Sequence, residues 1–196
     1  MVGAKGYLKE DPDPGNRLLT SQVDIVPGKG AIRAYFNRGI LSTQSLTHKV
    51  PLNNSGVPDS RVLRERIDQP GDPLRNGLAG QMIDGLSSLL ERARTEGGNC
   101  YAALYELNDT ELVQLLLNAP FVHIILYKDG EEDGVNKAAR QALEEAKIDI
   151  MTRDIIGNHL GHNKFMVYTD ANGNAKTVLT GSTNWTYTGL CTQSNN

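Results

Sequence analysis

The sequence predicts an α/β fold, specifically an α/β sandwich in which helices flank a mixed β-sheet. From residue 80 onward, short apolar runs alternate with segments whose apolar residues recur at helical spacing. These segments follow the order strand, helix, strand, helix, strand, which is typical of parallel strands joined by crossover helices. Two further apolar runs are separated by an Asn-Gly turn, which favours an antiparallel hairpin. A hairpin added to parallel strands makes the sheet mixed.

The first helix of this region is predicted over residues 82–93, where Met, Ile, Leu and Ala recur at helical spacing before a Gly-Gly pair. The apolar run 101–107 then indicates a strand. The sequence Asn-Asp-Thr-Glu that follows it resembles a capping box and starts a helix over residues 111–119, which Pro120 ends.

The continuous apolar run 121–127 predicts a strand that is covered on both faces. After a turn-rich segment, Asn136 is expected to cap a helix over residues 137–147. The strands that complete the sheet are predicted over residues 148–151, 164–168 and 176–180.

Residues 1–80 are predicted to form a loop-rich N-terminal segment, and residues 81–196 the lobe that carries the sheet. Pro and Gly interrupt most of the first segment, although residues 31–36 indicate a strand and residues 59–67 a short helix. A glycine loop at residues 26–30 contains a lysine but lacks the spacing of a phosphate-binding P-loop, so we interpret it as a solvated turn.

Composition narrows the class of protein. A hydrophobic content of 39% is too high for a disordered chain, and a net charge of −3 disfavours a general nucleic-acid coat protein. Cys100 and Cys191 form no metal-ligand set, and Cys100 opens a strand, which indicates a buried thiol. The start of the chain lacks the apolar core of a secretory signal, and no run approaches membrane-spanning length. We therefore expect a soluble, cytoplasmic protein.

Polar residues that could take part in catalysis lie at the start of the first half of the predicted hairpin and just after its second half. His162 and Lys164 stand two positions apart, and side chains two apart on a strand share a face. Ser182 and Asn184 repeat that spacing after the next apolar run. The hairpin would thus bring an imidazole, an ammonium, a hydroxyl and an amide to one sheet edge. This set of groups suits attack on a phosphodiester.

The pattern His162-x-Lys164 followed by Gly-Ser-x-Asn resembles the catalytic "HKD" motif of the phospholipase D superfamily of phosphodiesterases. The phrases CYAALYELNDTEL, GHNKFMVY and GSTNWTYTGLCTQSNN resemble uncharacterised bacterial members, and the resemblance covers roughly the second half of the chain. It implies hydrolysis or transphosphatidylation-type transfer through a phosphohistidine on His162, with no metal and no cofactor. It also implies that Lys164 and Asn184 bind the non-bridging oxygens and that Ser182 hydrogen-bonds the phosphate or the neighbouring site residues.

Three residues are candidates for supporting roles. Asp170 follows Lys164 one position later than the family's aspartate, so it falls on the opposite strand face unless a β-bulge restores the usual one, and we interpret it as a structural anchor of the hairpin. Asn195 stands near the place where many relatives carry an acidic residue that orients the histidine. Glu106, at the end of its strand, is an alternative orienting acid, and a solvated carboxylate is an equally good interpretation.

Relatives of this family assemble two such motifs, and one histidine attacks while the other protonates the leaving oxygen. The resemblance therefore implies a second motif, either from a downstream segment of a longer protein, which we favour, or from a homodimer partner. The expected substrate is a phosphodiester, with a phospholipid headgroup and a nucleic acid both open. A catalytically silent phosphate-binding or scaffold domain and a nuclease of the same superfamily are the alternatives.

The remaining histidines are His159 and His123. His159 and His162 stand three positions apart, so on a strand they would point to opposite faces, and no suitable third ligand follows; no zinc site is therefore predicted. His123 lies inside an apolar strand and is interpreted as structural.

Overall fold

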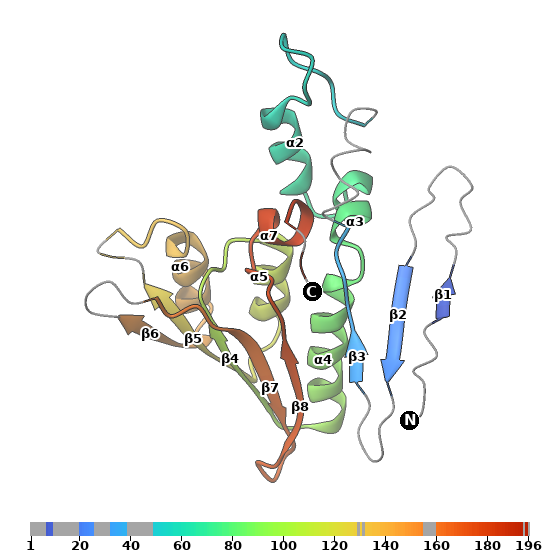
Figure 1. Ribbon diagram of the computed structural model, residues 1–196. Coiled ribbons are helices and arrows are strands. Elements are labelled where there is room, and N and C mark those ends of the chain that lie inside the picture. The colour runs from blue at the N-terminus through green and yellow to red at the C-terminus, as the bar shows by residue number, and fades with distance from the viewer. Residues whose placement is uncertain are drawn as a thin grey trace.

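The centre of the molecule is a five-stranded mixed sheet with the strand order β6-β5-β4-β7-β8, shown in Figure 1. The computed structural model describes residues 7–9, 20–25, 32–38, 49–128, 130, 132–154, 160–193 and 195. The five strands are β4 (Asn99–Leu104), β5 (Val122–Lys128), β6 (Asp149–Asp154), β7 (Lys164–Thr169) and β8 (Ala175–Thr180).

The connections make the sheet mixed, as predicted. β4, β5 and β6 are parallel and are joined by α5 (Thr110–Leu117) and α6 (Lys137–Glu145). β7 then pairs antiparallel with β4, and β8 pairs antiparallel with β7. The predicted α/β class and the predicted order of elements are confirmed.

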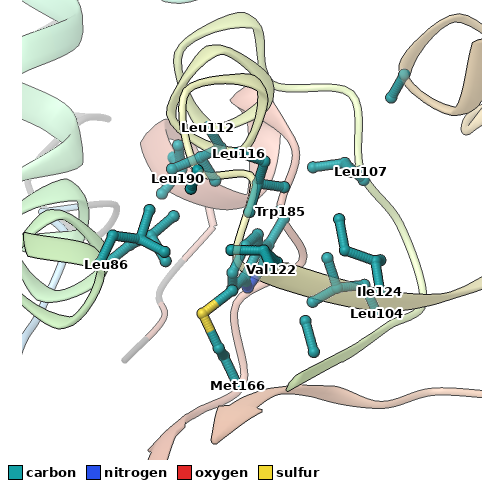
Figure 2. Close-up of a cluster of buried hydrophobic side chains, with 14 of the residues drawn as sticks. Leu86, Leu104, Leu107, Leu112, Leu116, Val122, Ile124, Met166, Trp185 and Leu190 are labelled. Atoms are coloured by element: carbon teal, nitrogen blue, oxygen red, sulfur yellow. The ribbon is translucent and has the colours of Figure 1, made fainter. Parts of the chain in front are cut away.

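The hydrophobic core lies between the sheet and the helices α4 (Met82–Glu96), α5 and α6. Parallel strands joined by right-handed crossovers that run in one direction place their helices on the same face, which accounts for α5 and α6. α4, which precedes β4, packs against the same core. Figure 2 shows apolar side chains of helices and strands meeting there. The buried residues labelled there include Leu86, Leu104, Leu107, Leu112, Leu116, Val122, Ile124, Met166 and Leu190.

The other face of the sheet is much less covered in the described part of the chain. Ile125 of β5 is 39% exposed, so the prediction that residues 121–127 are covered on both faces is wrong. Alternate side chains of a strand point to opposite faces of the sheet, and the set that contains Ile125 lies on the face that the described helices do not cover. Each of the five strands places a large apolar residue on this open face, namely Tyr101, Ile125, Met151, Phe165 and Val178.

The first part of the chain adds a small sheet and two helices. β1 (Tyr7–Lys9), β2 (Thr20–Ile25) and β3 (Ile32–Ala34) form an antiparallel sheet in that order. The predicted short helix is confirmed as α2 (Ser60–Ile67), and the predicted strand at residues 31–36 is confirmed in β3. The division of the chain at residue 80 stays a prediction. Core residues also come from before it, namely Val50, Ile67, Leu74, Leu78 and Ala79.

A helix that the sequence analysis did not identify, α3 (Pro73–Ala79), begins in a segment rich in Pro and Gly. Asp72 is its N-cap, and its side chain accepts a hydrogen bond from the Leu74 N–H at 2.6 Å. Proline is favoured at the first helical position because its missing N–H would have no helical partner there. Asp-Pro was therefore a helix-start signal as well as a turn signal.

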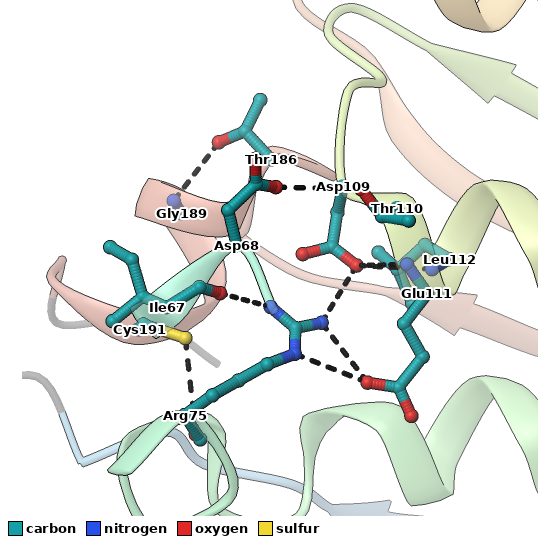
Figure 3. A network of polar contacts seen from close by, with 10 residues as sticks. All are labelled: Ile67, Asp68, Arg75, Asp109, Thr110, Glu111, Leu112, Thr186, Gly189 and Cys191. Atoms are coloured by element: carbon teal, nitrogen blue, oxygen red, sulfur yellow. Dashed lines mark hydrogen bonds and ion pairs between the residues drawn. The ribbon is translucent and has the colours of Figure 1, made fainter. Parts of the chain in front are cut away.

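The fully buried guanidinium of Arg75 ties α3 to α5, as Figure 3 shows. Its Nη2 donates to Asp109 Oδ1 at 2.8 Å and to Glu111 Oε2 at 3.1 Å, and its Nη1 donates to the Ile67 carbonyl at 2.6 Å. The same Asp109 oxygen caps α5 by accepting from the N–H groups of Glu111 and Leu112. One carboxylate therefore satisfies a helix start and a buried cation together.

Asn136 is the N-cap residue of α6, as predicted, but its side chain makes no capping hydrogen bond to the helix. Its Nδ2 donates to the carbonyls of Tyr105 and Tyr127 at 2.8 Å each, and its Oδ1 accepts from the Leu107 N–H at 2.8 Å. The amide has both a donor and an acceptor, so it can bind several backbone groups that have lost their sheet partners. It thereby fixes the segment that leaves β4.

The buried ion pair predicts a large loss of stability in Arg75→Ala. The substitution leaves the Asp109 carboxylate buried without its cation, which should lower the free energy of unfolding by about 3–5 kcal/mol. Urea denaturation measures this loss. Arg66→Ala is the matched control, because it breaks the partly exposed Arg66–Asp72 pair at 2.9 Å and should cost roughly 1 kcal/mol or less. Equal costs for the two variants would contradict this account.

Candidate active site

Three chain segments meet where β4 ends and β7 begins. Leu104 pairs with Lys164 in the sheet, and the Tyr105 N–H continues this pairing by donating to the Asn163 carbonyl at 2.8 Å. The segment after β8 lies alongside as well, because the Trp185 N–H donates to the Glu106 carbonyl at 3.2 Å. The two motifs from the sequence are therefore held at the same edge of the sheet.

The predicted residues His162 and Lys164 meet at the ring of Tyr105. The His162 imidazole is exposed, and its ring centroid lies 4.7 Å from that of Tyr105 in an edge-on arrangement. The Lys164 ammonium lies 5.3 Å from the same ring centroid and donates to the His162 carbonyl at 3.4 Å. Since β7 begins at Lys164, His162 belongs to the connecting segment before the strand. The sequence analysis did not single out Tyr105, although it lies in the phrase CYAALYEL.

Asn184 and Glu106 also come together, although nothing local in the sequence links them. Asn184 Nδ2 donates to Glu106 Oε2 at 2.6 Å. Gly189 of α7 (Tyr187–Cys191) packs so closely that an added Cβ would lie 2.3 Å from the Asn184 carbonyl oxygen. Asn184 Oδ1 is buried and makes no hydrogen bond to any described residue. The carboxylate thus holds the side-chain amide of Asn184, and the close approach of Gly189 fixes its backbone.

Lys164 is a nearly buried cation with a carboxylate nearby. Burial lowers its pKa, because desolvation disfavours the charged form, and the negative charge of Glu106 opposes this by raising it. The net direction is a pKa below the ordinary lysine value. Glu106 therefore contacts the amide of Asn184 and acts electrostatically on Lys164.

Ser182 and Asn195 contact one another on the side of α7. Ser182 Oγ donates to Asn195 Oδ1 at 3.1 Å, and Asn195 Nδ2 donates to the Gly189 carbonyl at 2.8 Å. The Asn195 N–H in turn donates to Asn37 Oδ1 at 3.0 Å. These contacts join the end of the chain to the segment that carries Asn184. The orienting role of Asn195 toward His162 stays a prediction.

Asp170 lies just beyond the end of β7 that is opposite Lys164, so the structure does not bring these two residues together. Its Oδ1 accepts from the N–H groups of Asn172 and Asn174 at 2.9 Å each, and its Oδ2 pairs with Lys176 at 2.9 Å. These contacts, above all that with Lys176, lower the pKa of Asp170 to about 2. The contacts agree with the interpretation of Asp170 as an anchor of the hairpin.

The remaining predictions concern cysteines, metals and membranes. Cys100 and Cys191 are buried free thiols, and burial raises the pKa of Cys100 to about 11. His159 lies outside the described residues. Within the described ranges, no three His, Cys, Asp or Glu side chains form a metal-binding group. Each described helix is too short or too polar to cross a lipid bilayer.

No family model matches this sequence, and no curated protein does. Three solved structures are similar in fold. Nuc from Salmonella typhimurium, described as a phospholipase D family member, is 19% identical, with a TM-score of 0.45 over 60% of this chain and 72% of that one. NucT from Helicobacter pylori is 17% identical, with a TM-score of 0.41 over 59% of this chain and 76% of that one.

Polyphosphate kinase from Porphyromonas gingivalis is 18% identical, with a TM-score of 0.40 over 59% of this chain and 18% of that one. At these identities the likeness concerns fold, so activity has to be argued from the residues of this chain.

The lowered pKa of Asp170 predicts a pH-dependent contribution to stability. A carboxyl whose folded-state pKa lies below its unfolded value of 3.8 stabilises the fold above that value, and the contribution disappears as pH falls from about 3.8 to about 2. Asp170→Asn should therefore lower the melting temperature at neutral pH, with a deficit that shrinks as pH falls through this window. Calorimetry over this pH range tests it, with the exposed Glu65→Gln as control. A deficit independent of pH would refute the assignment.

The proximity of Glu106 to Lys164 predicts the direction of a pKa change. Glu106→Gln keeps a hydrogen-bond acceptor for Asn184 but removes the charge that raises the Lys164 pKa, so that pKa should fall further. NMR titration of the side-chain carbon next to the Lys164 amine measures it, again with Glu65→Gln as control. An unchanged or higher Lys164 pKa in Glu106→Gln would show that the carboxylate does not act on this amine.

Proposed function

We propose that this chain is a phosphodiesterase lobe of the phospholipase D type, in which His162 is the nucleophile. The observation that carries the proposal is the exposed imidazole beside a nearly buried ammonium, both in contact with the Tyr105 ring. An exposed imidazole is accessible to a phosphorus atom. The phospholipase D-like motif and fold support the same assignment.

In the first chemical step, a ring nitrogen of His162 forms a bond to phosphorus, and the bond between phosphorus and the leaving oxygen breaks. The leaving oxygen takes a proton from a general acid, which the family resemblance assigns to the histidine of a second motif. In the second step, water or an alcohol attacks the phosphohistidine, the phosphorus–nitrogen bond breaks, and that second histidine accepts the proton. Attack by water gives hydrolysis, and attack by an alcohol gives transfer.

Such a site lowers the activation barrier mainly by stabilising the negative charge that builds up on the non-bridging oxygens in the transition state. Lys164 provides a fixed positive charge, and because it is nearly buried its field is screened less than that of a surface lysine. Asn184 provides an amide donor whose position is fixed by Glu106 at 2.6 Å. Glu106 is thus a positioning residue in this proposal, since it acts through Asn184 and Lys164.

One observation favours a rival function, a catalytically silent phosphate-binding domain. Glu106 accepts from Asn184 and lies close enough to raise the Lys164 pKa, so the two proposed phosphate-binding groups already interact with a carboxylate. Such an internal anion weakens attraction for a phosphodiester. A silent domain would still bind a phosphate group through Lys164, but it would form no covalent intermediate.

The proposed function predicts an acid-labile phosphoryl adduct on His162. With the protein in its measured oligomeric state, bis(4-nitrophenyl) phosphate should be hydrolysed, and quenched samples should carry the adduct in a His162 peptide detected by mass spectrometry. His162→Asn should abolish the adduct and lower turnover about a hundredfold or more, since a nucleophile is lost.

His123→Asn is the matched control, because His123 pairs with Asp149 near the start of β5, at the end of the sheet opposite to this site, and should leave turnover unchanged. Parallel assays with single-stranded DNA and with phosphatidylcholine vesicles separate the nuclease and lipase forms of the proposal. Phosphate binding that depends on Lys164, without turnover or adduct on any of these substrates, would instead assign the silent domain.

A further inference from the structure

A cavity of about 860 Å³ lies between α4 and two strands that belong to different sheets. β8 of the five-stranded sheet forms one wall, β3 of the small sheet forms another, and α4 contributes a third. Lys164 and Thr183 line it as well, so the cavity reaches the edge of the candidate active site. Most of the residues that line the cavity do not belong to the candidate active site.

Both strand walls are sheet edges in the described part of the chain. β8 is the last strand of its sheet, and β3 is the last strand of the other. An edge strand has a row of backbone N–H and C=O groups without a neighbouring strand, which makes it a template for pairing with another extended chain. Two such edges facing one cavity are suited to a bound strand.

The helix wall is apolar and close to the strands. Met82, Leu86 and Leu89 of α4 line the cavity. Gly85 permits a close approach, since an added Cβ there would lie 3.1 Å from Cδ2 of the Tyr35 ring, directly after β3. A segment that enters the cavity can therefore bury apolar side chains against α4.

The charged residues that line the cavity are all basic, namely Arg33, Arg92, Lys164 and Lys176. Three of them have carboxylates nearby that do not line the cavity, because Arg92 pairs with Glu96 at 2.9 Å, Lys176 pairs with Asp170 at 2.9 Å, and Glu106 acts on Lys164. The exposed Arg33 stands on β3. In a chain whose net charge is −3, this basic lining, and Arg33 above all, favours a negatively charged occupant.

We propose that this cavity binds an extended acidic peptide of a partner protein, which adds a strand to the edge of β8. Its backbone pairs with the open edge, one set of alternate side chains packs on α4, and acidic side chains lie beside Arg33 and Lys176. A hydrocarbon chain would leave the backbone groups of both edges unpaired. A nucleic acid would place bases and sugars, which carry no regular backbone donors and acceptors, along the same edges. Of these three ligands, only an acidic peptide matches the strand edges, the apolar wall of α4 and the basic residues at the same time.

Fluorescently labelled hexapeptides with Glu at alternate positions and Val, Leu, Phe or Tyr between them test the proposal with the full chain. Fluorescence anisotropy should show saturable binding, and hydrogen exchange should slow at backbone amides of β8. The same peptides with Lys in place of Glu should bind about tenfold more weakly because the charges then repel. Peptides N-methylated at alternate backbone amides should also lose about tenfold, since they cannot pair with a strand edge.

Arg33→Glu should weaken binding of the acidic peptides about tenfold, whereas Arg61→Glu should not. Arg61 is an exposed arginine at the start of α2, so the two variants change the net charge equally. Absence of binding by any acidic hexapeptide at millimolar concentration would overturn the proposal. Binding that ignores N-methylation would overturn it too, as would Arg33-dependent binding of single-stranded DNA or lysophosphatidylcholine in place of the peptides.

Discussion

The antiparallel pairing of β7 with β4 is the interaction on which the core and the candidate site depend. The two strands are far apart in the sequence, yet they pair without interruption from Asn99–Thr169 to Leu104–Lys164. Because β4 also pairs with β5, this register fixes where the segment after β4 meets the segment before β7. A slip of one residue would turn Lys164 away from the helix-covered face and move it away from Glu106.

The same register explains the electrostatics of the site. Lys164 shares its sheet face with Met166 and Tyr168, which are fully buried. A cation on such a face is costly unless a charge or hydrogen-bond acceptor lies within reach. At the edge of the sheet its ammonium reaches the His162 carbonyl, the Tyr105 ring and the field of Glu106. The cation is therefore tolerated where the sheet ends, and that is also where an anion from solvent can reach it.

The described helices cover one face of the sheet and leave its other face and the edge at β8 more exposed. Large apolar residues remain on the open face, and no strand among the described residues pairs with the outer edge of β8, which lies beside α4. Uncovered edges in natural sheets are commonly protected by charges, by twisting or by a covering element. Here Lys176 lies on the edge strand but is paired with Asp170 at the hairpin end. Val178, at the centre of β8, is 58% exposed.

The sequence by itself determined whatever depends on neighbours within a few positions. Helical and strand periodicity predicted the elements after residue 80, and the Asn-Gly turn predicted the hairpin, where Gly173 has a φ of 81°. The contacts of Asp170 with Asn172 and Asn174 lie within four residues, so its anchoring role was accessible to the same reasoning. The motif that contains His162, Lys164 and Asn184 was likewise visible in the sequence, and the chemistry assigned to these residues stays a proposal.

The tertiary structure alone decided which distant groups meet. Glu106 and Asn184 are 78 positions apart, and Asn136 binds backbone carbonyls of two strands although its sequence context indicates a helix cap. Such contacts depend on strand register and on which sheet face the helices cover. Both are set by packing of the whole chain, because burial of apolar surface has no preferred sequence separation. The local sequence pattern therefore identified the functional side chains, and the tertiary fold determined which distant residues they contact.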